Sequence, residues 1–342
     1  MKKIFKKNKQ APQGRITNET VAEHREHILA GGRRFKYPVQ YTKHKLIINT
    51  ILIISVVLVA FVLVSWWQLY KAQNTSTFYY RTVRIVPAPV ASIDGQAVRY
   101  SDYLMLYRPV EHFMSQNGQL AESKDDRERQ LGLYKRSAID RAVDNAYAEK
   151  VALEKGIKVE EADINDVILR GRQASNGSIS QDLYDASLLD TLGFSKEEYR
   201  EMIKRSLLYS KVAYAVDDKA KELSNLVKLR VSGDKDFVKI AESIGKGVTV
   251  GGSGDYVQLS TPDGGVAIEA SKLKTGEVSD VKKTTSSDGY YIVRLDGKSG
   301  DKVKYTFIKI PLTRLSDDIA KLRKDGKVSE FISIPAKPTK TQ

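Results

Sequence analysis

The sequence predicts an α+β protein that contains one transmembrane helix, an α-helical domain and a small α/β domain. Three observations support this fold class. A run of 25 residues near the N-terminus carries no charge. Several segments in the middle of the chain repeat apolar residues at helical spacing. The C-terminal third instead alternates strand-forming residues between turn signals.

The uncharged run covers residues 46–70 (LIINTILIISVVLVAFVLVSWWQLY). A helix of this length rises roughly 37 Å, which exceeds the ~30 Å hydrocarbon core of a bilayer. Basic residues precede the run and aromatic residues end it, as expected at the two membrane interfaces. We therefore expect an uncleaved transmembrane helix. Its predicted interface residues are Lys43, Lys45, Trp66, Trp67 and Tyr70.

Two alternatives fit this run less well. A cleaved signal peptide has a shorter apolar region, and no small-x-small cleavage site follows here. A buried helix of a soluble protein rarely continues this far without one charge.

The net charge of +14 is concentrated before the helix. Residues 1–45 contain twelve basic and three acidic side chains, a net charge of +9, which leaves +5 for the rest. The positive-inside rule then places this basic tail in the cytoplasm and residues 72–342 outside it, in a cell membrane. We expect the tail to attract anionic membrane lipid. The charge does not indicate a nucleic-acid partner.

Within the tail, residues 17–30 predict a short helix that Thr17 or Asn18 caps and that Gly31-Gly32 ends. His24 and His27 are three residues apart, which could suit a metal. No third ligand accompanies them, so solvated positions are the better interpretation. The chain has no cysteine, which excludes disulfides and thiol chemistry.

After a polar linker, residues 71–86, a strand near 90–94 turns at Asp94-Gly95 and forms a hairpin that Val98 closes. Ser101 is expected to cap the next helix.

Helices are then predicted at 124–155, which Gly156 ends, and at about 160–172. A further helix begins at Ser195, which forms a capping box with Glu198; Phe194 and Tyr199 make a hydrophobic staple. Amphipathic helices of this kind are packing surfaces, and they could also leave a groove for peptides.

Three segments in this order resemble one family: PAPVASIDGQAVRYSDYLMLY, EKGIKVEEADINDVI at the end of the long helix, and LGFSKEEYREMIKRSLLYSKVA. They resemble the N-terminal domain of SurA/PrsA-type chaperones. The resemblance implies a helical chaperone domain over residues 87–216. It also implies unfolded or exported polypeptides as partners.

Residues 217–312 resemble a parvulin-type (PpiC) prolyl isomerase domain. DKDFVKIAESI matches a helix of that family, and LKTGEVSDVKKTTSSDGYYIVRLDG matches its last two strands. Independently of this resemblance, Tyr290, Ile292 and Leu295 are strand-forming residues and predict a strand here. The remaining residues, 313–342, are expected to form a C-terminal extension with a helix at 315–324, a turn at Asp325-Gly326 and a short strand.

The active centre of that family uses two histidines, and this chain has neither. Tyr291 stands at the second histidine position, and Val266 falls near the aromatic residue that cradles proline. Asp255 remains, in a role that shapes a turn. All four histidines lie outside this region, at 24, 27, 44 and 112. A tyrosine hydroxyl could replace one imidazole hydrogen bond. We nevertheless expect weak or no isomerase activity, with no cofactor or metal.

The opening strand of the parvulin domain is also missing at its usual place. We expect Tyr305–Ile310 to fill that position inside the sheet, paired with 290–295 and packed against a helix at 219–230. Phe307 would then approach Tyr291. The alternative is that 303–312 forms only an edge hairpin.

These features favour a membrane-anchored extracytoplasmic folding factor that holds unfolded exported polypeptides. An active prolyl isomerase and a non-catalytic envelope protein with one partner are the alternatives. No P-loop, GxSxG motif or metal-ligand spacing points to another enzyme.

Overall fold

The computed structural model describes residues 18–36, 41–174, 177–233, 235–284, 286 and 288–335. These residues belong to two compact units, residues 1–67 and 68–342, which we describe separately. The proposed cap at Thr17 and the chain end after Pro335 lie outside the described residues. The predicted fold class is confirmed: helices dominate, and the main sheet lies in the C-terminal region.

The described residues of the first unit form α1 (Asn18–Lys36) and most of α2 (Tyr41–Tyr70). Helix α1 continues through Gly31-Gly32, so the prediction that these glycines end it is wrong. Glycine weakens a helix by about 1 kcal/mol, which is not enough to stop one. Helix α2 departs from helical geometry at His44. Its segment His44–Tyr70 contains an 18-residue window with a mean hydropathy of 3.0. By length and composition, this segment can cross a membrane.

The second unit begins with the last turn of α2, which is bound to the helical domain. Leu69 is buried, and its carbonyl accepts a hydrogen bond from Tyr100 Oη at 2.6 Å. Tyr70 Oη donates to the Pro89 carbonyl at 2.7 Å. Tyr70 is therefore half-buried against this domain, and its hydroxyl is occupied there, which the sequence did not predict.

The segment predicted as a polar linker is folded. Asn74 N–H donates to the Gln68 carbonyl, and Gln73 Nε2 donates to Ser333 at the far end of the chain. Helix α3 (Thr77–Ile85) follows, with Tyr80 and Val83 buried. Long-range hydrogen bonds and two apolar anchors therefore order the stretch that the sequence predicted only as a polar linker.

The predicted hairpin is present as β1 (Pro89–Ile93) and β2 (Gln96–Arg99). Asp94 and Gly95 both have positive φ, as a tight hairpin turn requires. Helix α4 (Tyr100–Gln116) starts directly after β2 with Arg99 as its cap residue. Ser101 consequently lies inside the helix and does not cap it.

The rest of the helical domain follows the predicted order, with a short β-hairpin and one helix added. Helix α5 (Lys124–Lys155) ends at left-handed Gly156, and the Ser195–Glu198 capping box forms as predicted. Between these lies an unpredicted helix, α7. The elements are α6 (Glu161–Gly171), β3 (Gln173–Ala174), β4 (Gly177–Ser178), α7 (Gln181–Leu192) and α8 (Lys196–Val216).

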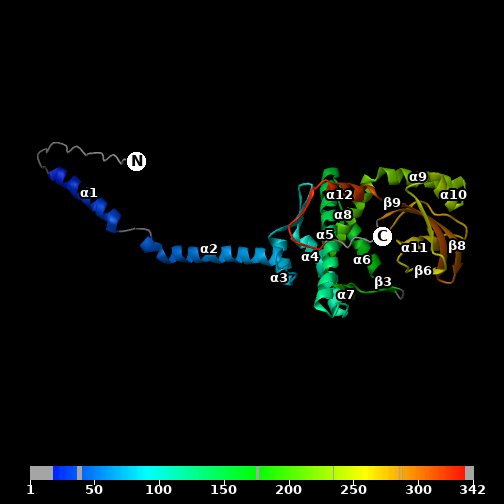
Figure 1. Cartoon of the computed structure of the whole chain (residues 1–342), viewed down its shortest axis with the longest axis horizontal. Helices are drawn as coiled ribbons and strands as arrows, with labels where there is room; N and C mark the ends of the chain where they lie inside the picture. Colours follow the sequence, from blue (N-terminus) through cyan, green and yellow to red (C-terminus); the bar gives the residue numbers. More distant parts are fainter. Residues whose placement is uncertain are drawn as a thin grey trace. The chain divides into compact units, whose positions relative to one another are not determined.

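The α/β domain is a sheet covered by helices on both faces (Figure 1). Its strand order is β5-β9-β8-β7, with β6 paired to β9. Helices α9 and α10 cover one face, where Val227, Phe237, Ile292 and Ile308 form a core, and α11 covers the other. The helices are α9 (Asp218–Gly233), α10 (Phe237–Ile244) and α11 (Val266–Ser271). The strands are β5 (Thr249–Gly252), β6 (Val257–Gln258), β7 (Lys282–Lys283), β8 (Gly289–Ser299) and β9 (Lys302–Pro311).

Strand β9 lies between β5 and β8, so the interior position predicted for Tyr305–Ile310 is confirmed. It pairs antiparallel with β8 over nearly its whole length, and α9 packs against both strands. The edge-hairpin alternative is wrong. Phe307 pairs directly with Val293, and Tyr291 pairs with Lys309, so Phe307 is diagonal to Tyr291 on the same face.

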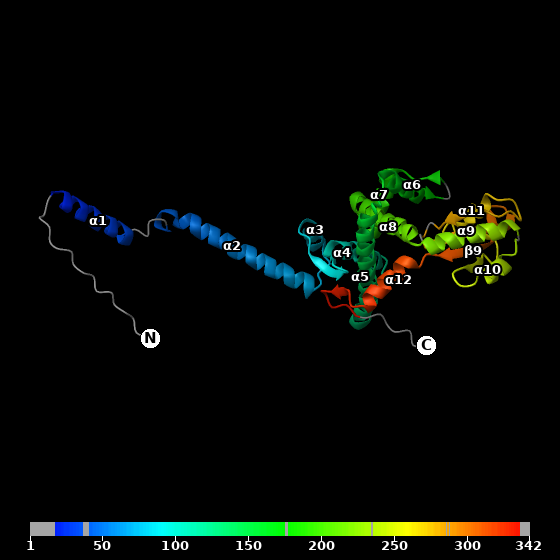
Figure 2. The ribbon, with the colours of Figure 1, turned by 90° about the horizontal axis from the view of Figure 1, so that it is seen from above.

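After β9 the chain returns to the helical domain. Helix α12 (Arg314–Lys324) packs against α5 and α8 (Figure 2), and β10 (Val328–Glu330) pairs with β1 to make the order β10-β1-β2. Leu315, Ile319 and Ile332 are buried in the helical core. The C-terminal segment therefore completes the helical domain, and the α/β domain is an insertion into it.

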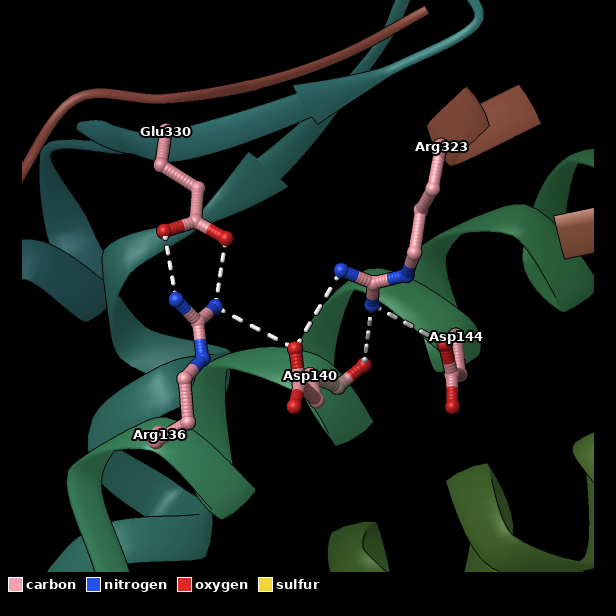
Figure 3. A network of polar contacts seen from close by, with 5 residues as sticks. All are labelled: Arg136, Asp140, Asp144, Arg323 and Glu330. Atoms are coloured by element: carbon pink, nitrogen blue, oxygen red, sulfur yellow. Dashed lines mark hydrogen bonds and ion pairs between the residues drawn. The ribbon is translucent and has the colours of Figure 1, made fainter. Parts of the chain in front are cut away.

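Ion pairs hold this returning segment to α5 (Figure 3). The Arg136 guanidinium binds both carboxylate oxygens of Glu330 and also Asp140. Arg323 of α12 binds Asp140 and Asp144. Arg136 is largely buried, with 11% of its side chain exposed, so its bidentate contact is shielded from solvent.

Candidate polypeptide-binding site

The contact between α11 and the sheet brings together three of the four residues predicted from the parvulin resemblance. Tyr291, Val266 and Phe307 belong to one apolar cluster, in which Tyr291 is 2% exposed. Asp255 is exposed in a loop, where its carboxylate accepts the N–H of Tyr256 at 2.7 Å. The structure thus brings the first three together and leaves Asp255 apart.

The hydroxyl groups on this face are bound to other groups of the protein. Tyr291 Oη donates to the Gly265 carbonyl at 3.2 Å, and Tyr305 Oη donates to the Asp263 carboxylate. Burial raises the pKa of both phenols, and the neighbouring Asp263 raises that of Tyr305 further. Both tyrosines therefore stay protonated and act as hydrogen-bond donors.

Asp263 organises the start of α11. Its carboxylate accepts the N–H groups of Gly265, Val266 and Ala267 at 3.0, 2.9 and 2.8 Å. The sequence analysis missed this residue. The available signal was weak, because Asp263 lies two residues before the N-cap, Gly265, whereas the usual signature places aspartate at the N-cap itself.

Phe307 covers the neighbouring strand. A Cβ atom built on Gly251 would lie 2.6 Å from Phe307 Cζ, so only glycine leaves room for this ring over β5. The face thus offers neither an imidazole nor an unoccupied tyrosine hydroxyl to hold a twisted prolyl amide. Its polar groups instead stabilise the fold.

A depression in the surface lies between the helical and α/β domains. It has a volume of about 900 Å³ and is bordered by α6, α8 and β7. This volume is within the range of ligand-binding clefts. We call it the interdomain groove; its lining residues are Val167, Arg170, Gly171, Tyr199, Leu207, Ser210, Lys211, Tyr214, Ala215, Lys283 and Thr284.

Hydrogen bonds fix the two tyrosines of the groove. Tyr214 Oη donates to the Gly289 carbonyl at 2.6 Å, which also joins α8 to the sheet. Tyr199 Oη lies 2.9 Å from Tyr184 Oη. Burial raises the pKa of Tyr199 and of Tyr214. The rings are therefore neutral and rigidly placed.

The charged side chains of the lining are all basic. Lys211 pairs with Asp163, and Lys283 Nζ lies 4.5 Å from the centroid of the Tyr214 ring. Arg170 is exposed and has no ion-pair partner among the described residues. The groove thus combines apolar and aromatic walls with excess positive charge.

These features define a helical domain that the C-terminal segment, with α12 and β10, completes, and into which an α/β domain is inserted. The model of one family, described as the SurA-like N-terminal domain, matches residues 40–213. The match covers just over half of the chain, and the chain belongs to this family. Comparison with curated proteins finds no match. Membership supports an extracytoplasmic, chaperone-like role in protein folding that involves unfolded polypeptides.

Proposed function

We propose that this chain is a membrane-anchored folding factor that holds unfolded exported polypeptides outside the cytoplasm. Helix α2 would span the cell membrane, with residues 1–45 in the cytoplasm. Lys43 and Lys45 would lie at the inner interface, with Trp66 and Trp67 at the outer one. The uncharged segment, the basic residues before it and the family match support this arrangement.

The interdomain groove is the proposed binding site for these polypeptides, and its lining is the main observation that supports polypeptide binding. Its walls suit extended segments with aromatic or aliphatic side chains, since Tyr199, Tyr214 and Leu207 present apolar surface. Its uncompensated cations favour segments that also carry carboxylates.

A binding experiment with the full chain in detergent tests the groove. The double variant Arg170→Glu/Lys283→Glu should weaken binding of a fluorescent acidic, aromatic-rich unfolded peptide by about tenfold, which is ~1.4 kcal/mol. Both side chains are exposed, so the fold should persist. Lys204→Glu is the matched control, because Lys204 is exposed on α8 outside the groove. Equal affinities for the two variants would refute the site.

The inserted domain resembles parvulins but, in this proposal, lacks isomerase activity. The observation that supports this is the occupied state of the Tyr291 and Tyr305 hydroxyls. An isomerase assay on a proline-containing peptide, with the full chain, should give no rate above the uncatalysed one. A rate typical of parvulins that Tyr291→Phe abolishes would show that the hydroxyl had replaced an imidazole.

A further inference from the structure

Helix α3 has two apolar faces, of which only one is covered. Tyr80 and Val83 are buried, 1% and 2% exposed, and face the helical domain. On the opposite face Phe78 and Ile85 are 59% and 82% exposed. They are seven residues apart, two helical turns, and therefore share one side. Exposed Val86 extends the apolar surface.

This outer face is also basic. Residues 71–87 contain three cations, Lys71, Arg81 and Arg84, and no acidic residue. Arg84 pairs with Glu198 across the domain, whereas Arg81 is exposed and has no ion-pair partner among the described residues. Arg81 lies between Phe78 and Ile85 at helical spacing, so a cation interrupts the apolar surface.

The helix is held rigidly in this orientation. Arg108 Nη2 donates to Thr77 Oγ1 at 2.7 Å, and the Arg108 guanidinium stacks 4.6 Å from the centroid of the Tyr80 ring. Thr75 Oγ1 donates to Glu111 at 2.9 Å. The outer face therefore cannot turn inward to bury Phe78 and Ile85.

The position of α3 along the chain identifies its partner. Six residues, 71–76, separate it from the end of the apolar segment, and a fully extended chain of that length reaches about 20 Å. The Asn74–Gln68 hydrogen bond turns this connection back and shortens it. If α2 spans a membrane, α3 starts near its outer interface. Exposed Phe and Ile side chains beside arginine are the composition of helices that lie in that interface.

We propose that the outer face of α3, formed by Phe78, Arg81 and Ile85, together with Val86 directly after the helix, binds the anionic lipid surface of the membrane that α2 spans. This inference rests on the proposed anchoring of α2. Phe78 and Ile85 enter the boundary between headgroups and acyl chains, and Arg81 binds lipid phosphate. The contact fixes the helical domain close to the bilayer.

The absence of cysteine makes the test direct, since a single introduced cysteine can carry an environment-sensitive dye. The full chain is reconstituted in vesicles of phosphatidylcholine and phosphatidylglycerol, with and without spin-labelled lipid that quenches the dye. The labelled variants are Phe78→Cys and Ile85→Cys. Leu229→Cys on α9, 73% exposed, is the soluble control, and Leu58→Cys reports on the span.

Labels at 78 and 85 should lose roughly half of their fluorescence, as expected for side chains at shallow depth in the bilayer. The label at 229 should lose almost none. Adding Arg81→Glu to Ile85→Cys should reduce the quenching at 85 in anionic vesicles.

If the label at position 58 is quenched but the labels at 78 and 85 behave like the label at 229, the α3 contact is refuted. The proposed membrane span of α2 is then still supported. A client or a second copy covering this face would give the same lack of quenching. If 58 is also unquenched, the anchor itself is refuted.

Discussion

Asp217 joins the helical domain to both ends of the inserted α/β domain. It is 4% exposed and lies between α8 and α9. One carboxylate oxygen accepts the N–H of Ala220 at 2.9 Å. The other accepts the N–H groups of Thr313 and Arg314 at 2.7 and 3.0 Å. A single buried carboxylate thus binds the chain where it enters the inserted domain and where it leaves.

Replacing Asp217 with asparagine keeps the shape but removes one acceptor atom and the charge. The amide oxygen of the asparagine can accept the N–H groups of Thr313 and Arg314. Its NH2 group then faces the N–H of Ala220, so that two donors meet and no hydrogen bond forms there. A hydrogen bond to a charged group contributes about 1.5–3 kcal/mol, so Asp217→Asn should lower the free energy of unfolding by roughly 2–4 kcal/mol. At roughly 2–4 °C per kcal/mol, the Tm should fall by several degrees.

Thermal unfolding followed by circular dichroism measures this change on the full chain in detergent. Asp218→Asn is the matched control, because Asp218 is exposed next to it, and its effect should stay within about 0.5 kcal/mol. Hydrogen exchange should show the amides of Ala220, Thr313 and Arg314 losing protection together. Equal Tm values for the two variants would refute this role of the carboxylate.

Three further outcomes are expected. Burial raises the pKa of Asp102 and Arg205 lowers it, so Arg205→Met should raise it further. The variant then loses stability as the pH rises through the raised pKa of Asp102, because the buried carboxyl must ionise without its partner. Denaturant unfolding should therefore show the variant less stable than wild type by about 3 kcal/mol at pH 7, and by less at pH 4. Glu330→Gln should cost about 1–3 kcal/mol by denaturant unfolding and expose the amides of β10 to exchange, because Arg136 loses its bidentate partner. Protease added to intact protoplasts should digest residues 72–342 and spare the N-terminal tail; protection of the large domain would contradict the topology.

Local signals predicted much of the fold. Helix α5 and its end at Gly156 follow from periodicity and a left-handed glycine, and the Ser195–Glu198 box marks the start of α8. Strand β9 was predictable because removing an interior strand leaves backbone groups unpaired, and KYTFIKIPL alternates as a strand should.

Elements that depend on distant partners were not predictable. Helix α7 exposes Leu183 and Leu189 and buries only Tyr184, so it has no single apolar face to signal a helix. The 71–76 segment is ordered by a contact between Gln73 and Ser333, 260 residues away. Strand β10 has three residues and gains its place only from pairing with β1.

The candidate site likewise has a part that the sequence predicted and a part that it did not. The cluster of Tyr291, Val266 and Phe307 was predicted from the parvulin resemblance, although the register places Phe307 opposite Val293. The interdomain groove was not located, because its walls come from elements that meet only after the inserted domain has folded.

Client holding tests the central claim most directly. Light scattering records the aggregation of an unfolded exported protein while the full chain, in detergent, is added at increasing ratio. Wild type and Lys204→Glu should suppress aggregation equally, and Arg170→Glu/Lys283→Glu should need several-fold more protein for the same effect. Suppression that is absent in the wild type, or unchanged in the groove variant, would contradict the assignment of this groove as the site where the protein holds its clients.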